Sequence, residues 1–367
     1  MTLYAWGANS YGQLGLGHKS DEELEPKEVP LKNIDLSPQD IVSIAGGAGH
    51  VLILDSKGLL YCCGWNSKGQ LGLSDDTLKF TPIEILKEFN IVEISCGWDF
   101  SAAVSECGKQ FVWGNNQYTQ LGLSKSITCT GIPSRLQVSQ KLATGFKHVS
   151  CGLRHMAMIT KEGGLVVAGM GGRGQLGLGD NFDDVNGYLS IAKVPDLEEV
   201  RSVASGKHHT LALKEDGTLF SWGENRFGQL GMNPGIGLTF IPLEVFQDEG
   251  FDRLYAGWTH SAALTKSGEV FSWGRDTYGQ LGCEKKRENL FKPEKIPGLS
   301  NVRQLSLGSE HNLAVTSDNK LYSWGWNEHG SCGTGNKKDL RIPTQIFKGR
   351  NVKLAFACTG SSFAVVD

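Results

Sequence analysis

Short apolar segments recur along the chain in pairs, and a turn sequence separates the two members of each pair. In the clearest pair, the apolar residues 211–213 and the segment Leu219–Trp222 flank the dipeptide Asp216-Gly217. Asp-Gly between two apolar segments predicts a β-hairpin, because such a turn needs a residue with positive φ. Related turns carry glycine at this place, and Asn319, which tolerates the same conformation, replaces it once. The pattern therefore predicts a series of short hairpins.

Two motifs mark these hairpins at a nearly constant interval. The first strand of a hairpin follows Gly-x-x-His, and histidine is present in five of seven copies. The second strand ends in Trp-Gly or a variant of it, usually followed by Gly-Gln-Leu-Gly, and successive copies lie 57, 50, 55, 54, 51 and 51 residues apart. A period of about 50 residues is typical of a propeller or a solenoid. The seven second-strand copies are Trp6-Gly7, Cys63-Gly64, Trp113-Gly114, Ala168-Gly169, Trp222-Gly223, Trp273-Gly274 and Trp324-Gly325.

The chain begins and ends within this repeat. Leu3–Trp6 has the character of a second strand, whereas Ser362–Val366 has the character of a first strand. Pairing the two would close a ring and remove the exposed sheet edge of an open array. A solenoid would instead need polar terminal caps. We therefore predict that residues 1–367 form one domain, an all-β seven-bladed β-propeller closed by pairing of its N- and C-terminal strands.

Composition and charge exclude several classes of function. Charged residues make up 20% of the chain, its net charge is −3, and neither end carries a basic tail, so binding to nucleic acid is not expected. No apolar run of about 18 residues predicts a membrane span, and no N-terminal segment resembles a signal peptide. The nine cysteines lack metal-site spacing, and Cys96, Cys151 and Cys358 are interpreted as small buried residues beside Gly-x-x-His. These features favour the cytoplasm, with the nucleus as a second location.

The repeat also explains two patterns that could be taken for active sites. One histidine per repeat is expected to bridge neighbouring blades and not to bind metal. The segment Gly169–Gly174 matches the dinucleotide-binding fingerprint by its letters, but it occupies a Trp-Gly position outside any βαβ unit. The chain contains no phosphate-binding loop. We therefore expect no catalytic residues, no metal, no cofactor and no nucleotide binding by the protein alone.

The two variable residues of each Gly-x-x-His motif are the candidate binding positions. All seven pairs begin equivalent strands and should surround one mouth of the central channel; the last pair is assigned as Gly360 and Ser361. Aromatic residues and arginine in a concave setting are typical anchors of protein interfaces, with a solvated ring of loops as the alternative. Trp326 and Glu328 are added because they exceed what the repeat requires. The candidate partner-binding residues are Trp98, Asp99, Arg154, Lys207, His208, Trp258, Thr259, Glu310, Trp326 and Glu328.

The combination of Trp-Gly-x-Asn-x-x-Gly-Gln-Leu-Gly with Gly-x-x-His resembles the repeat of the regulator of chromosome condensation family over the whole chain. Residues 5–18, 96–100, 257–260, 308–314 and 322–330 are similar to a branch of that family that regulates secretion. The resemblance implies a guanine nucleotide exchange factor or a GTPase-binding regulator of secretion. It implies a small GTPase and an exocyst subunit as partners of a cytosolic protein, and we expect a monomer. In the founding member, some functional acidic and histidine residues occupy the variable positions of Gly-x-x-His. The resemblance implies roles for the residues in the matching positions here, which are Asp99, Lys207, His208, Thr259 and Glu310.

The chain departs from the founding member of that family in two respects. That member uses a projecting β-wedge and a basic tail, whereas the repeat lengths here predict no expanded blade and no tail is present. A scaffold that binds a protein through the same face without exchange activity is therefore the alternative. A photoreceptor like the plant member of this fold is not expected, because Trp98 and Trp258 lie on non-adjacent repeats and neither is followed by arginine. A secreted enzyme inhibitor is not expected either, since a signal peptide is missing.

Overall fold

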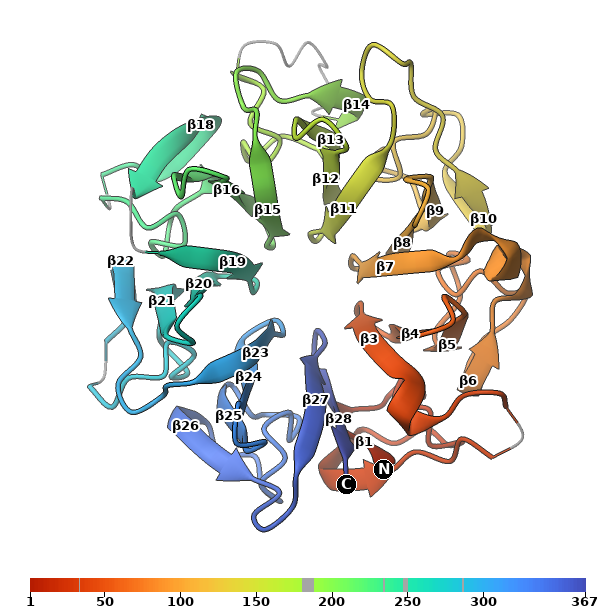
Figure 1. The fold of residues 1–367 in the computed structure, drawn as a ribbon, viewed down its shortest axis with the longest axis vertical. Helices are drawn as coiled ribbons and strands as arrows, with labels where there is room; N and C mark the ends of the chain where they lie inside the picture. Colours follow the sequence, from red (N-terminus) through yellow and green to blue (C-terminus); the bar gives the residue numbers. More distant parts are fainter. Residues whose placement is uncertain (33, 180–187, 234, 247–249, 286) are drawn as a thin grey trace.

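Seven four-stranded antiparallel sheets surround a central channel in the computed structural model (Figure 1). The structure describes residues 1–367 except residues 33, 180–187, 234, 247–249 and 286. One strand of each sheet lies beside the channel and the fourth lies at the outer rim (Figure 1). The predicted seven-bladed β-propeller is confirmed.

We name the sheets blades A to G and give their strands from the channel outward. Blade A comprises β27 (Val352–Ala357), β28 (Ser361–Val366), β1 (Thr2–Ala8) and β2 (Glu22–Glu28); blade B comprises β3 (Ile41–Gly46), β4 (His50–Asp55), β5 (Leu60–Gly64) and β6 (Thr77–Pro82). Blade C comprises β7 (Ile91–Cys96), β8 (Phe100–Ser105), β9 (Gln110–Asn115) and β10 (Cys129–Arg135); blade D comprises β11 (Phe146–Cys151), β12 (His155–Thr160), β13 (Leu165–Met170) and β14 (Tyr188–Lys193).

The other three blades follow the same order. Blade E comprises β15 (Val200–Ser205), β16 (His209–Lys214), β17 (Leu219–Glu224) and β18 (Leu238–Phe246). Blade F comprises β19 (Phe251–Ala256), β20 (His260–Thr265), β21 (Val270–Arg275) and β22 (Asn289–Lys295). Blade G comprises β23 (Val302–Leu307), β24 (His311–Thr316), β25 (Leu321–Gly325) and β26 (Leu340–Ile346). Within the described residues, the 3₁₀ helices η1 (Pro38–Asp40) and η2 (Glu84–Phe89) lie outside the sheets.

Blade A closes the ring with strands from both ends of the chain. Strand β1 pairs with β28 in an antiparallel register that runs from Thr2 opposite Val366 to Gly7 opposite Ser361. The two termini consequently lie side by side (Figure 1). The prediction that the N- and C-terminal strands pair within one blade is confirmed.

The hairpin turns have the backbone conformation that the sequence predicts. Gly58, Gly108, Gly163, Gly217, Gly268 and Asn319 all have positive φ, with values between 61° and 89°. The glycine after tryptophan serves a different purpose. A Cβ atom added at Gly7 would lie 2.6 Å from the carbonyl oxygen of Gly360, so only glycine allows the two chain segments to approach this closely.

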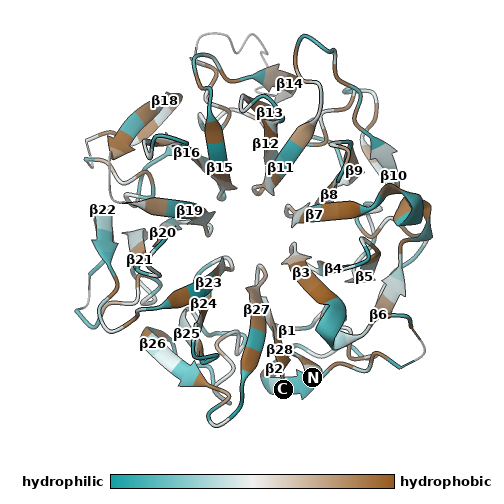
Figure 2. Cartoon of the chain, in the orientation of Figure 1, coloured by the Kyte–Doolittle hydropathy of each residue, from teal (hydrophilic) through white to brown (hydrophobic). Residues whose placement is uncertain are grey.

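The second strand of a blade is covered on both faces by neighbouring blades. Strands β4, β8, β12, β20, β24 and β28 are buried at every position. The outer strands β2 and β22 are mostly hydrophilic, whereas β18 carries apolar residues at the rim (Figure 2). This burial explains why the second strands appear in the sequence as continuous apolar runs and do not alternate with polar residues.

The structure corrects the register of the last Gly-x-x-His copy by one residue. In intact copies the glycine N–H donates to the carbonyl of the histidine, as between Gly308 and His311; in the last copy Cys358 N donates to Ser361 O at 2.8 Å. Ser361 therefore occupies the histidine position and Thr359 and Gly360 are the variable pair. Cys358 stands at the glycine position, so it is not equivalent to Cys96 and Cys151. The copy was misaligned because it lacks both the glycine and the histidine.

Five of the seven blade junctions contain the same chain of buried hydrogen bonds, which we call the inter-blade latch. At the junction of blades B and C, His50 Nε2 lies 3.0 Å from Ser101 Oγ. The Ser101 hydroxyl and the Trp113 indole N–H both donate to the carbonyl oxygen of Gln70 at 2.8 Å. His50 and Gln70 belong to blade B, whereas Ser101 and Trp113 belong to blade C. Equivalent latches are formed by His155, Thr210 and Trp222 on Gln175; His209, Ser261 and Trp273 on Gln229; His260, Asn312 and Trp324 on Gln280; and His311, Ser362 and Trp6 on Ser331.

The latch fixes the protonation state of its histidine. Because the serine or threonine hydroxyl has one proton and donates it to the carbonyl, histidine Nε2 must donate to the hydroxyl oxygen. The Nδ1 atoms of the five histidines are buried without a hydrogen-bond partner. Burial therefore lowers the pKa of His50, His155, His209 and His311 from 6.5 to about 3. The predicted bridging role is confirmed, although the histidine reaches the backbone through a side-chain oxygen.

The two remaining junctions replace the latch with apolar or weaker contacts. Between blades C and D, Phe100 takes the histidine position and packs in one core with Met156 and Ala168, which take the positions of the hydroxyl residue and the tryptophan. Between blades A and B, Val51 and Cys63 take those positions, and Cys63 Sγ lies 3.2 Å from the carbonyl oxygen of Gln13. At these two junctions the residues of the latch are thus replaced together. Replacement of only one of them would leave a buried polar group without a hydrogen-bond partner.

Deletion of residues 360–367 is expected to abolish the closed ring. The truncation removes β28 and exposes the edge of β1, so we expect aggregation or a large fall in melting temperature. As a control, a circular permutant that joins residue 367 to residue 1 by a short linker and opens the exposed turn at residues 124–127 should fold normally. A truncated protein that melts like the full-length chain would contradict closure by this pair of strands.

Acid is expected to destabilise the protein through the latches. The folded-state pKa of four latch histidines is about 3 and the unfolded value is about 6.5, so the unfolded chain binds more protons as the pH falls between these values. Each histidine should lower the free energy of unfolding by up to about 1.4 kcal/mol per pH unit in this window. Urea unfolding between pH 7.5 and 5 measures the slope.

The variant H209Q supplies the matched control for this effect. Glutamine can still donate an N–H towards Ser261 but does not titrate, so the slope should decrease by about one histidine's share. An unchanged slope in H209Q, or a wild-type stability that does not vary between pH 7.5 and 5, would show that the latches do not titrate as the structure requires.

Candidate partner-binding face

Backbone hydrogen bonds between blades place the variable residues around one mouth of the channel. Ala48 N donates to the carbonyl of Trp98 at 2.9 Å, Trp258 N to that of Ser309 at 2.7 Å, and Ser309 N to that of Thr359 at 3.0 Å. The first variable residue of one blade thereby contacts its counterpart in the next. We call the surface around this mouth the variable face. The expectation that these residues share one mouth is confirmed.

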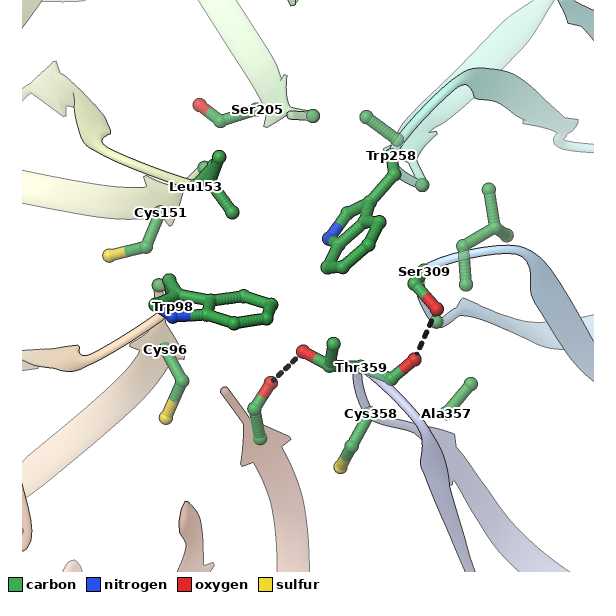
Figure 3. Close-up of a pocket in the computed structure, with 18 residues that line it drawn as sticks. Cys96, Trp98, Cys151, Leu153, Ser205, Trp258, Ser309, Ala357, Cys358 and Thr359 are labelled. Atoms are coloured by element: carbon green, nitrogen blue, oxygen red, sulfur yellow. Dashed lines mark hydrogen bonds between the residues drawn. The ribbon is translucent and has the colours of Figure 1, made fainter. Parts of the chain in front are cut away.

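Two of the predicted anchors meet across the channel. The indole rings of Trp98, from blade C, and Trp258, from blade F, point towards each other, and their centroids lie 5.5 Å apart at an interplanar angle of 43° (Figure 3). Both side chains are half-buried. Leu153, Ser205 and Cys358 line the small cavity of about 110 Å³ at this end of the channel (Figure 3). Sequence spacing places the two tryptophans on non-adjacent repeats, but it does not reveal that both side chains point towards the axis.

Two predicted basic residues lie against aromatic rings on this face. Lys207 Nζ is 5.4 Å from the centroid of the Trp258 ring, and the Arg154 guanidinium is 4.3 Å from that of Tyr118. Both distances are in the range of cation–π contacts. Lys207 thus places a positive charge beside the tryptophan pair, on the side of blade E. Arg154 lies farther away, at the junction of blades C and D.

The predicted acidic residue Asp99 is largely buried. It is 9% exposed, and its carboxylate accepts a hydrogen bond of 2.7 Å from Asn115 Nδ2. Burial raises the pKa of Asp99 above its ordinary value, while Asn115 and the charge of Arg154 oppose the change. The side chain therefore helps to hold the residue that follows Trp113-Gly114, and its role in partner binding remains a prediction.

Glu310 and Thr259 form one buried cluster between blades F and G. Glu310 is 6% exposed, and its carboxylate accepts hydrogen bonds of 2.6 Å from both Thr259 Oγ1 and Gln280 Nε2. One carboxylate oxygen also lies 3.8 Å from Nδ1 of the latch residue His260. Burial lowers the pKa of His260, and the charge of Glu310 opposes this effect. The intramolecular contacts occupy the Glu310 carboxylate, although one side of the residue reaches a cavity.

That cavity, which we call the basic cavity, has a volume of about 430 Å³ and lies on the variable face of blades D to G. Among the predicted residues, Lys207, His208, Trp258, Thr259, Glu310 and Trp326 line it. The lining residues that neither motif singled out in the sequence are Arg173, Glu224, Arg226, Phe227, Arg275 and Tyr278.

These lining residues belong to the turns that follow Trp-Gly. The residue after this dipeptide donates its N–H to the carbonyl of the second variable residue, as Glu224 does to His208 at 2.8 Å and Arg275 to Thr259 at 3.0 Å. Both motifs therefore contribute to one face. The signal in the sequence is the variation among repeats at the positions that follow Trp-Gly.

Trp326 and Glu328 are not equivalent in the structure. The Trp326 ring lies 6.1 Å from Tyr278 and 5.2 Å from His329, centroid to centroid, and forms a wall of the basic cavity. Glu328 is exposed and does not line that cavity. The two residues therefore belong to one turn, but only Trp326 joins the other predicted residues.

Two classes of feature are not found within the described residues. Nowhere in that part of the chain do three or more histidine, cysteine, aspartate or glutamate side chains gather closely enough to hold a metal ion. Across the same described residues, no helix is long and apolar enough to cross a membrane.

Comparisons with known proteins agree with this architecture. The family model described as RCC1-like domain matches residues 2–366. The chain is 36% identical to the secretion-regulating guanine nucleotide exchange factor of Mus musculus, in an alignment that covers 94% of this chain and 78% of that protein. It is 33% identical to the ultraviolet-B receptor UVR8 of Arabidopsis thaliana, over 87% of this chain and 73% of the receptor.

A solved structure supports the same fold. The crystal structure of Prp20p from Saccharomyces cerevisiae superimposes with a TM-score of 0.86 over 99% of this chain and 90% of that one, at 24% sequence identity. That structure was described together with the binding of Prp20p to Gsp1p and histones. At this identity the likeness concerns the fold.

Proposed function

Since the chain belongs to the RCC1-like domain family, we propose that it is a protein-binding propeller that acts as a guanine nucleotide exchange factor on a small GTPase. The observation that carries the proposal is the 36% identity to an exchange factor along 94% of the chain. The geometry of the variable face is consistent with it. Half-buried tryptophans flanked by basic residues are typical of interface anchors, because aromatic side chains contribute a large contact area at a low cost in conformational entropy.

Under this proposal the variable face is the docking surface. Trp98 and Trp258 lie at the centre of the face, with Lys207 beside them, and Arg154 lies towards the junction of blades C and D. His208, Thr259, Glu310 and Trp326 form the part nearest to the basic cavity. Asp99 supports the face indirectly, through its hydrogen bond with Asn115. Glu328, which is exposed, is proposed to contact the partner outside the basic cavity. A preformed surface of this kind lowers the entropy cost of association.

The role in regulated secretion is also part of the proposal. Its support is the name of the mouse relative, a secretion-regulating exchange factor. We propose a monomer in the cytoplasm that acts with a small GTPase and an exocyst subunit, with a nuclear fraction as a further location. Recovery of partners by the intact propeller, followed by release of labelled GDP from any GTPase recovered, tests both parts.

The alternative is a scaffold that uses the same face without exchange activity. The repeat lengths, which differ by at most 7 residues, favour it because they leave little room for a projecting wedge. The two functions differ in a measurable property. An exchange factor must bind the empty GTPase more tightly than the nucleotide-loaded form, because nucleotide and exchange factor oppose each other by linkage. A scaffold has no such requirement.

Replacement of both Trp98 and Trp258 by alanine is expected to weaken partner binding roughly tenfold or more, because the two indoles supply the central apolar contact. The circular dichroism spectrum should not change, since neither ring belongs to a latch. A matched control, I132A/I342A, removes apolar side chains that are 62% and 49% exposed on the outer strands β10 and β26. If the folded W98A/W258A variant binds as well as this control, the partner uses another face.

The isolated propeller is expected to bind neither GDP nor GTP, whereas a GTPase partner should bind more tightly once its nucleotide is removed. The sequence contains no phosphate-binding loop, so exchange must act by deforming the nucleotide site of the partner. Isothermal titration of the propeller with GDP and GTP checks the first statement, and titration with loaded and empty GTPase checks the second. Equal affinity for both GTPase forms would overturn the exchange function in favour of the scaffold.

A further inference from the structure

The basic cavity carries a charge opposite to that of the whole chain. Its walls contain four cationic side chains, Arg173, Lys207, Arg226 and Arg275, and two carboxylates, Glu224 and Glu310. Four positive and two negative groups leave a net charge of +2, although the net charge of the protein is −3. The cavity is therefore a local site of positive charge on a mildly acidic molecule.

Three of these cations have no carboxylate partner within 4 Å in the described part of the chain, namely Lys207, Arg226 and Arg275. The two carboxylates of the cavity are already engaged elsewhere. Glu224 Oε1 lies 3.6 Å from Arg173, and the Glu310 carboxylate accepts hydrogen bonds from Thr259 and Gln280. The charge of the three cations is thus available to a ligand.

Aromatic rings hold these cations in place. The Arg275 guanidinium lies 5.1 Å from the Phe227 centroid and 4.8 Å from that of Tyr278, and its Nε donates to Thr277 at 3.1 Å. Arg226 lies 5.4 Å from the centroid of Phe227. A guanidinium held against a ring keeps N–H groups free for a carboxylate, and little side-chain entropy is lost when the ligand binds.

His208 lines the basic cavity beside Lys207. Its Nδ1 atom is buried and has no hydrogen-bond partner. Burial, together with the charges of Lys207, Arg173 and Arg154, lowers the pKa of His208 to about 4. The neutral imidazole of His208 therefore leaves the net charge of the cavity walls at +2.

We propose that the basic cavity binds an acidic segment of the protein partner, with aspartate or glutamate carboxylates paired to Arg226, Arg275 and Lys207. This inference rests on the proposed function in so far as the partner docks on the variable face. An acidic polypeptide segment suits the site better than a free phosphate, because aromatic rings line the walls and a free phosphate has no apolar atoms to contact them. The rings of Trp258, Tyr278 and Trp326 provide contact area for the apolar atoms of the segment.

Titration of the isolated propeller with a short fluorescent peptide of Glu, Asp and Phe residues tests the inference. We expect saturable binding that weakens as salt is raised, and a roughly tenfold or greater loss of affinity in R226E/R275E, since each reversal replaces attraction with repulsion. R226Q/R275Q should lose less. The control R253E reverses the 69% exposed Arg253 of blade F, outside the cavity, and should bind the peptide nearly as the wild type does.

Besides a failure of the acidic peptide to bind, three results would overturn the inference. The first is equal affinity of R226E/R275E and R253E in folded protein, and the second is equal binding of the same peptide with Gln and Asn in place of Glu and Asp. The third is displacement of the peptide by inorganic phosphate or GDP at lower concentrations than by unlabelled acidic peptide. Melting curves of each variant verify folding. The titration needs no GTPase, so it remains informative if the exchange function fails. A GTPase that binds the variable face while the acidic peptide does not would refute the cavity proposal alone.

Discussion

Each blade depends on its neighbours to cover the faces of its second strand. A single sheet of this size cannot bury residues such as Leu52 or Phe363 on both faces, so no blade is stable alone and the ring must close. Closure brings buried polar atoms into the junctions, where the latches satisfy most of them. Each latch binds one carbonyl with a hydroxyl or amide and an indole from the next blade, and its histidine must stay neutral. The packing of apolar side chains and the need to hydrogen-bond buried polar atoms thereby impose the same geometry at five junctions.

The rigid ring separates the residues that maintain the fold from those that vary. The histidine, the glycine after tryptophan and the turn glycines are constrained by backbone approach or buried hydrogen bonds. Residues between these fixed points, such as Lys207 and Arg275, are free to vary but are still held at defined places on one face. This arrangement supplies a preorganised surface whose chemistry can change without disturbing the core.

The sequence was sufficient to predict the ring, its closing strands and the turns, because each depends on local signals repeated seven times. Gly217 and Asn319 identify their turns in the sequence, because the turns need residues that tolerate positive φ. Contacts that depend on side-chain direction could not be predicted in this way. The meeting of Trp98 and Trp258 requires knowledge of where the channel axis lies, and the burial of Glu310 depends on Gln280 and Thr259 from different parts of the chain. The alignment error at Ser361 has the same origin, since a degenerate copy offers no local signal to set its register.

The two junctions without a histidine latch divide the ring into unequal arcs. Blades B and C form one arc, joined internally by the His50 latch, and blades D, E, F, G and A form the other, joined by four latches. Trp98 belongs to the short arc and Trp258 to the long one, so their contact joins the two arcs across the channel. The junctions at Phe100 and Val51 are held by apolar packing, because each carries a buried core that spans both blades. The channel mouth is therefore the place where an aromatic contact across the axis, and not a latch between neighbours, connects the two arcs.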